Sequence, residues 1–74
     1  MSREMQFFMY LIEKYAEYKN STAGDILTQW DDLGITNFIY DMYPLYSSEA
    51  IENAFADIDR LTAEKQQKNG GRNK

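Results

Sequence analysis

The residues to test first for chemistry are carboxylates, because the chain contains neither histidine nor cysteine. A general acid or base acting near neutral pH would have to be an Asp or Glu whose pKa is raised by burial. Asp31 and Asp32 are the obvious pair, but neighbours on a helix point about 100° apart and do not converge on one substrate. We therefore predict that both lie on a solvated helix face and that the chain has no catalytic residue.

Metal sites and activated nucleophiles have little support either. The thiolate and imidazole ligands of zinc are missing, and no stretch has the alternating oxygen ligands of a calcium loop. Ser21, Ser47 and Ser48 have no base to activate them and are interpreted as helix caps. The four glycines lack the spacing of a phosphate-binding loop. We expect no metal, no cofactor and no enzymatic activity.

Charge is distributed unevenly along the chain. Between Asn20 and Asp59 there are eight acidic residues and no Lys, Arg or His. Residues 1–67 carry five bases and twelve acids, whereas residues 68–74 carry three bases and no acid, for a net charge of -4. Direct binding to nucleic acid needs clustered bases and is not expected. The acidic surface either keeps a small protein soluble, or imitates nucleic-acid phosphates and occupies a basic cleft of a DNA- or RNA-handling protein.

Eleven aromatic rings in 74 residues are interpreted mainly as the large side chains that a tiny core requires. Three tyrosines do not fit that interpretation: Tyr10 lies on the polar side of its predicted helix, Tyr40 lies opposite an apolar stripe, and Tyr46 follows Pro44 in a predicted loop. Exposed Tyr is typical of protein interfaces. The candidate partner-binding residues are Tyr10, Tyr40, Tyr46, Phe7, Tyr18, Asp31 and Asp32.

Two long helices are predicted in the first half of the chain. Apolar residues at three- and four-residue steps predict a helix from Arg3 to Lys19. Its apolar arc, about 200° wide, is large enough to touch two neighbours and suggests self-association. A second helix is predicted to begin at its cap Thr22, with Asp25 three residues on, and to end at Gly34 in the left-handed conformation.

The second half of the chain is predicted to hold a short helix and a long one. The short helix begins at its cap Thr36 and ends before Pro44, and the long one begins at Ser47 or Ser48. No two-residue alternation predicts a strand. The fold class is therefore all-α: a small compact bundle of three main helices plus one short helix. The predicted core is Phe8, Leu11, Ile12, Tyr15, Ile26, Leu27, Trp30, Leu33, Phe38, Met42, Ile51, Phe55, Ile58 and Leu61.

The domain organisation is simple. Residues 1–64 form a single helical domain, and residues 65–74 form a disordered polar and basic tail, because they include no apolar side chain. The uncharged run of residues 5–12 is far shorter than the roughly 20 residues that span a bilayer. We expect no membrane association, no export signal and a cytoplasmic location.

Five segments resemble a family of short bacterial and phage proteins, the domain of unknown function 3791. They are EMQFF (4–8), EKYAEYK (13–19), WDDLGIT (30–36), IYDMY (39–43) and IENAFADID (51–59), and the resemblance spans roughly Arg3 to Leu61. It implies a stand-alone helical protein of gut and other anaerobic bacteria with no assigned activity. Some members resemble the small partner encoded beside ADP-ribosyltransferase-like toxins, which implies an antitoxin or accessory role.

These observations predict a small protein that binds another protein without catalysis. The partner is either a second copy, giving a homodimer, or another protein to which this chain is an antitoxin-like or accessory partner. The alternative function is an acidic nucleic-acid mimic that inhibits a DNA- or RNA-handling protein through its acidic helices.

Overall fold

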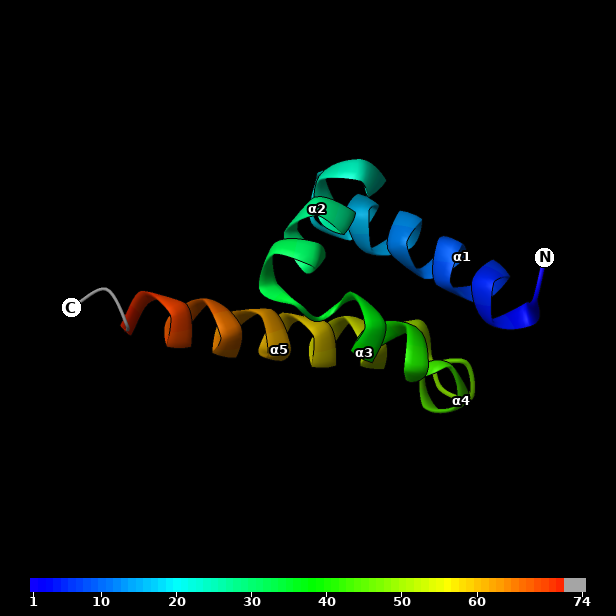
Figure 1. Ribbon diagram of the computed structural model, residues 1–74. Helices are drawn as coiled ribbons and strands as arrows, with labels where there is room; N and C mark the ends of the chain where they lie inside the picture. The colour runs from blue at the N-terminus through cyan, green and yellow to red at the C-terminus, as the bar shows by residue number, and fades with distance from the viewer. Residues whose placement is uncertain (72–74) are drawn as a thin grey trace.

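The computed structural model describes the backbone of residues 1–71 and the side chains of residues 1–67. All regular structure in that part of the chain is helical: α1 (Arg3–Tyr18), α2 (Ala23–Leu33), α3 (Thr36–Asp41), α4 (Tyr43–Tyr46) and α5 (Ile51–Gly71) (Figure 1). The predicted all-α class is confirmed. The three main helices are α1, α2 and α5, while the short helix of the prediction is divided into α3 and α4.

Side chains and backbone conformation fix the ends of the first two helices. The Ser2 hydroxyl accepts a hydrogen bond from the first turn of α1, and the Thr22 hydroxyl accepts one from the Asp25 amide at 3.1 Å. Thr22 is therefore the cap of α2, as predicted, whereas the interpretation of Ser21 as a cap is wrong. Gly34 ends α2 with φ 72°, in the left-handed conformation that glycine adopts without steric cost.

A break between α3 and α4 divides the predicted third helix. Met42 has φ -81° and ψ 9°, and Pro44 lies in the first turn of α4, where its missing amide hydrogen is not needed. The third helix was expected to end before Pro44, and Pro44 instead lies at the start of a further helix, α4. The prediction that Thr36 caps α3 is wrong, because Ile35 is the N-cap and the Thr36 hydroxyl donates to Asp31 instead.

The two serines between α4 and α5 form hydrogen bonds with the preceding helix, α4. The Ser47 hydroxyl donates to the Tyr43 carbonyl at 2.6 Å, and the Ser48 hydroxyl donates to the Leu45 carbonyl at 2.7 Å. Each of these two carbonyls also accepts a hydrogen bond from the backbone amide of the same serine, so each hydroxyl adds a second donor to a carbonyl at the end of α4. The prediction that Ser47 or Ser48 caps the last helix is therefore wrong, and α5 begins three residues after Ser48, at Ile51.

The last helix continues past the expected domain boundary at residue 64. It runs to Gly71, whereas a tail was expected from residue 65, and residues 72–74 lie outside the described part of the chain. Residues 63–67 are AEKQQ, all good helix formers. Adding such residues to a helix already held by its packed first half requires no new nucleation, so the helix continues past its last apolar residues.

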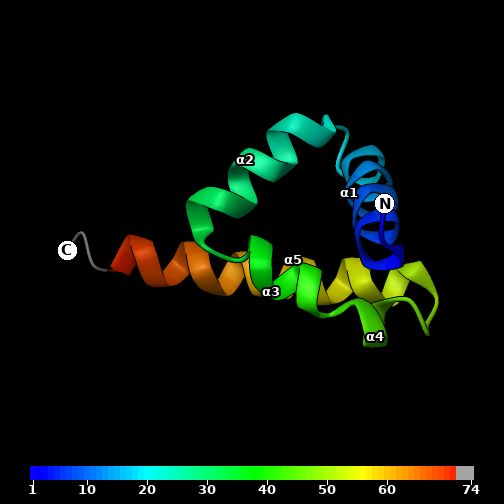
Figure 2. The same cartoon turned by 45° about the vertical axis from the view of Figure 1, so that its right-hand side comes forward.

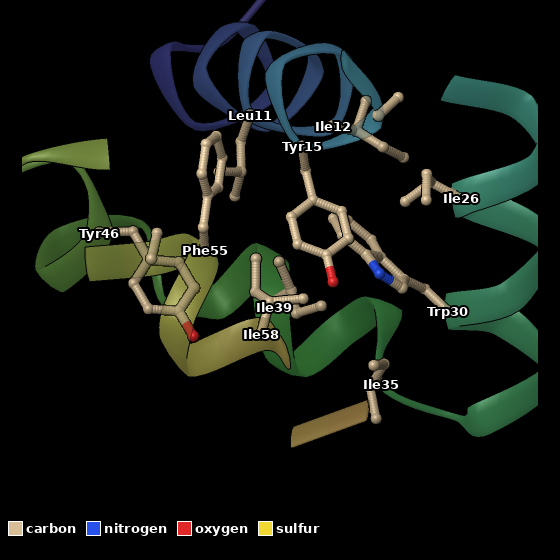
Figure 3. Packing of buried hydrophobic residues seen from close by; sticks show 12 residues of the cluster. Leu11, Ile12, Tyr15, Ile26, Trp30, Ile35, Ile39, Tyr46, Phe55 and Ile58 are labelled. Carbon is tan, nitrogen blue, oxygen red and sulfur yellow. The ribbon is translucent and has the colours of Figure 1, made fainter. Parts of the chain in front are cut away.

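All five helices contribute side chains to the core, as the close view in Figure 3 shows. Trp30 is fully buried, and its ring lies 5.9 Å from that of Phe8 and 5.7 Å from that of Tyr15. Two predicted core residues are wrong: Leu27 is 37% exposed and Phe38 is also exposed, because α2 and α3 each bury only a narrow face. The buried hydrophobic residues are Leu11, Ile12, Tyr15, Ala16, Ile26, Trp30, Ile35, Ile39, Tyr46, Ala54, Phe55 and Ile58.

The helices are arranged along α5, the longest element. Figures 1 and 2 show α2 descending from the end of α1 to α3, which lies against α5, while α4 forms the turn that leads into α5. The C-terminal half of α5 extends beyond the other helices, and the molecule measures 42 × 22 × 21 Å. This arrangement leaves one side of α1 and the adjoining side of α2 without a covering helix.

Candidate functional site

The adjacent carboxylates on α2 do not form a reactive pair. Asp31 and Asp32 are both exposed, as predicted, and Asp31 accepts a hydrogen bond from the Thr36 hydroxyl. Within residues 1–67 no cluster of three or more Asp, Glu, His or Cys side chains has the geometry to hold a metal ion. The structure offers no constellation for acid–base or metal chemistry at these positions.

Asp57 and Asp59, on α5, are instead hydrogen-bond acceptors that hold this helix to the rest of the molecule. Tyr46 and Arg60 both donate to Asp57. Tyr15 donates to Asp59 at 2.5 Å, and Tyr18 and Lys19 also reach this carboxylate, at 2.9 and 3.3 Å. A carboxylate with two or three donors has little basicity left, so both side chains are structural.

The pKa values of these groups follow from the same contacts. The hydrogen bond from Tyr46, with help from Arg60, holds the pKa of Asp57 below its ordinary value against the opposing effect of burial. Burial acts to raise the pKa of Asp59, but its three donors outweigh that effect and the pKa is lowered. Burial, followed by hydrogen bonding to the carboxylates, raises the pKa of the Tyr15 and Tyr46 phenols.

The three tyrosines predicted to face a partner lie in three different environments. Tyr10 is 49% exposed on α1. Tyr40 is half-buried, and its ring lies edge-on against that of Phe8 at 5.6 Å. Tyr46 is 1% exposed, which contradicts the exposure predicted for it. The prediction placed Tyr46 in a loop, but a turn of helix after Pro44 directs its ring into the core and its hydroxyl to Asp57.

The other two predicted aromatic candidates, Phe7 and Tyr18, pack against rings of α4 and α5. The Phe7 ring packs between those of Tyr10 and Tyr43, at 6.3 and 5.7 Å. Tyr18 is exposed, yet its ring stacks on Phe55 at 4.8 Å. The structure therefore does not gather the seven candidates into one surface, and their binding role stays a prediction.

An apolar groove on the other side of α1 is the most distinct surface feature of the described residues. It has a volume of about 410 Å³ and lies between α1 and the first turns of α2. Several of its side chains are exposed although apolar, with Met9 at 45% and Leu27 at 37%. The residues that line it are Met5, Phe8, Met9, Ile12, Glu13, Ala23, Gly24 and Leu27.

The groove was not predicted, although part of its signal is present in the sequence. The wide apolar arc of the first helix indicated a second contact surface, and Met5 belongs to that arc. The missing part is Leu27, which was assigned to the core. Its place beside Met9 depends on the angle between α1 and α2, and periodicity within one helix does not determine that angle.

Comparison with known proteins gives a single result. The model of the family described as "Protein of unknown function (DUF3791)" matches residues 6–65. Neither the curated proteins nor the solved structures contain a match to this chain. Among the described residues, no helix has both the length and the apolar character needed to cross a membrane.

Proposed function

The chain belongs to the DUF3791 family of proteins of unknown function, and we propose that it is a non-catalytic protein-interaction module. The observation that carries this proposal is the groove between α1 and α2, which keeps the apolar side chains of Met5, Met9 and Leu27 exposed. Contiguous exposed apolar surface mostly marks a binding site in a small folded protein. Methionine suits such a site, because its flexible thioether adapts to different partners.

Two forms of this binding are proposed. In the first the chain associates with a second copy, and in the second it is an antitoxin-like or accessory partner of another protein. Both take place in the cytoplasm, the compartment predicted from a chain without cysteine. Tyr10, exposed at the far side of α1, extends the contact surface if the partner wraps around this helix.

Partner capture with matched surface variants tests the function. The wild-type protein retains a partner from extracts of the source cell, and the purified pair is measured by calorimetry. Met9→Ser and Leu27→Ser each weaken binding about tenfold, because each removes one apolar contact of the groove. Leu45→Ser is the control, since Leu45 is equally exposed but lies outside the groove.

Two results would contradict the proposed function together. One is that nothing is retained by the wild-type protein under conditions in which it is folded. The other is a constant monomer mass in sedimentation over a wide concentration range, which excludes the second copy.

A second function, nucleic-acid mimicry, is favoured by the acidic side chains on α2. Asp25, Asp31 and Asp32 are all exposed, and no base lies between Asn20 and Asp59. A mimic would bind a basic cleft with an affinity that falls steeply as salt screens the charges. Asp31→Asn combined with Asp32→Asn weakens such binding, and indifference to both salt and substitution would eliminate it.

A further inference from the structure

We propose that the groove between α1 and α2 binds an amphipathic helix of a partner protein whose apolar face is flanked by Lys or Arg. This inference rests on the proposed function and adds the chemistry of the partner. The groove has two helical walls and an apolar floor, the arrangement that accepts the apolar face of a third helix. Its volume of about 410 Å³ is enough for several aliphatic anchors and far less than a whole helix.

The preference for basic flanks comes from the charges around the groove. Glu13 is the charged residue that lines it. Leu27 is followed by Asp31 one turn further along α2, on the same face. Asp31 also lines a neighbouring hollow with Gly34 and Thr36, so the acidic rim continues beyond the groove.

Acidic residues also line a second hollow, which meets the groove through an aromatic contact. Phe8 lines the groove, and its ring touches that of Tyr40, which lines a hollow with Glu4 and Asp41. No Lys or Arg lines the groove or either hollow.

The two lysines towards the end of α1 pair with carboxylates that do not line the groove. Lys14 pairs with Glu17 at 3.8 Å and lies over the Tyr10 ring, while Lys19 pairs with Asp59 at 3.3 Å. Within residues 1–67 the carboxylates around the groove make no ion pair, so they remain available to a partner's cations.

A second copy is the less favoured occupant on the same grounds. Residues 1–67 carry five bases and twelve acids, so another copy brings charge of the same sign to an acidic rim. Like charges facing each other across an interface disfavour association. A partner helix with basic flanks is attracted to the acidic rim, whereas a second copy is repelled by it.

Gly24 provides a variant that fills the groove without disturbing the core. It lines the groove, and a Cβ built on it meets no atom within 4 Å. Leucine and alanine both raise helix propensity over glycine, so both variants are expected to fold. Gly24→Leu places a side chain in the binding space, whereas Gly24→Ala adds one methyl group and is the matched control.

The test uses the full chain and two synthetic helices measured by calorimetry at low and moderate salt. Both peptides carry Leu or Met at positions i, i+3, i+4 and i+7; one has Lys at the flanking positions, and the other has Glu. The Lys peptide is expected to bind at least about tenfold more tightly, with a preference that shrinks as salt increases. Gly24→Leu weakens it at least about tenfold and Gly24→Ala less than about twofold.

Charge variants show whether the preference for the Lys peptide comes from the rim of the groove or from the general acidity of the protein. Glu13→Lys reduces the preference for the Lys peptide, whereas Glu49→Lys, an exposed position outside the groove, leaves it largely unchanged. Equal binding of the two peptides, no binding of either, or binding that ignores Gly24→Leu would overturn the inference. A dimer in sedimentation that Gly24→Leu dissociates would also overturn it, by assigning the groove to a second copy.

The proposed function and the helix-binding groove can be contradicted by different results. If a natural partner is retained but its binding is unaffected by Gly24→Leu, the interaction module stands and the helix-binding groove does not. If no partner is retained, no peptide binds and the chain stays a monomer in sedimentation, both fail.

Discussion

Two aspartates of α5 help to hold the helices together. Asp57 and Asp59 lie two residues apart on α5 and accept hydrogen bonds from Tyr46 and Tyr15, which belong to other helices. Charge-assisted hydrogen bonds of this kind are stronger than neutral ones. Each tyrosine thus contributes both an aromatic ring to the core and a polar contact at its edge.

Removing the Tyr46 hydroxyl tests one of these contacts. Tyr46→Phe keeps the buried ring but deprives Asp57 of a donor, so we expect the free energy of unfolding to fall by about 1.5–3 kcal/mol. Tyr10→Phe is the matched control; its hydroxyl makes no hydrogen bond within the described residues, and the expected change is below about 0.5 kcal/mol. Urea unfolding measures both variants, and equal losses would show that the hydroxyl of Tyr46 contributes nothing.

The lowered pKa values of the two aspartates predict a loss of stability in acid. Their folded-state pKa values lie below those of the unfolded chain, near 3.9, so their contribution is complete above about pH 5. It is lost as the pH falls through the folded-state values, because protonation removes the negative charge that strengthens these hydrogen bonds and forms the ion pairs with Lys19 and Arg60. We expect Asp57→Asn with Asp59→Asn to flatten the dependence of unfolding free energy on pH between about 5 and 2. A slope unchanged by the double substitution would assign the acid sensitivity to other groups.

The exposure of a single residue was predictable only where it follows from periodicity within one helix. Tyr10 is exposed because it lies on the polar side of α1, and its position follows from periodicity alone. Tyr46 is buried because Pro44 begins a helical turn and because Asp57, eleven residues away, offers an acceptor. Pro44 is a local signal for the start of a helix, but Asp57 is far from Tyr46 in the sequence, so no local pattern could have shown where its hydroxyl binds.

The existence of the long helices was predictable, while several of their ends were not. Apolar spacing gave α1, α2 and α5, and the cap Thr22 and the terminator Gly34 are where the sequence signals placed them. Ser47 and Ser48 show the limit of such signals. A serine between two helices can bond to either of them, and here both hydroxyls bond backward to α4.

Alanine substitution at two glycines of α2 is expected to have opposite effects. Gly34 has φ 72°, a conformation that costs an L residue roughly 1–2 kcal/mol, so Gly34→Ala lowers the free energy of unfolding by about that amount. Gly24 is within the helix and has open space around it, so Gly24→Ala raises the free energy of unfolding by about 0.5 kcal/mol. Urea unfolding of the two variants checks the signs, and a loss at both positions would contradict the assigned backbone conformations.

The groove and the charge of the whole surface depend on how the helices are assembled. The sequence identified the acidic middle of the chain, and its wide apolar arc on α1 indicated an extra contact surface. The sequence did not show how α1 packs against α2, and this packing leaves Leu27 exposed in the groove together with Met9. The angle between two helices is set by many side chains together, so the groove became visible only in the assembled structure.

The excess of acid predicts that moderate salt stabilises the protein. Six acidic residues of the middle segment make no ion pair within the described residues, and their mutual repulsion opposes the compact state. They are Asp25, Asp31, Asp32, Asp41, Glu49 and Glu52. Raising NaCl from about 10 to about 300 mM shortens the Debye length from about 30 Å to below 8 Å and screens that repulsion. We expect the free energy of unfolding, measured with urea, to rise by about 0.5–1 kcal/mol.

The opposing effect is the screening of the four surface ion pairs formed within residues 1–67, each worth about 0–1 kcal/mol, among them Lys19 with Asp59 and Arg60 with Asp57. Asp32→Asn with Asp41→Asn distinguishes the two contributions, because it removes repulsion and leaves every ion pair in place. Both residues lie near helix C-termini, where negative charge is unfavourable, so the double variant is more stable than the wild type at low salt. Its stability also changes less with added salt. A wild-type stability that falls with salt would mean that the ion pairs outweigh the repulsion.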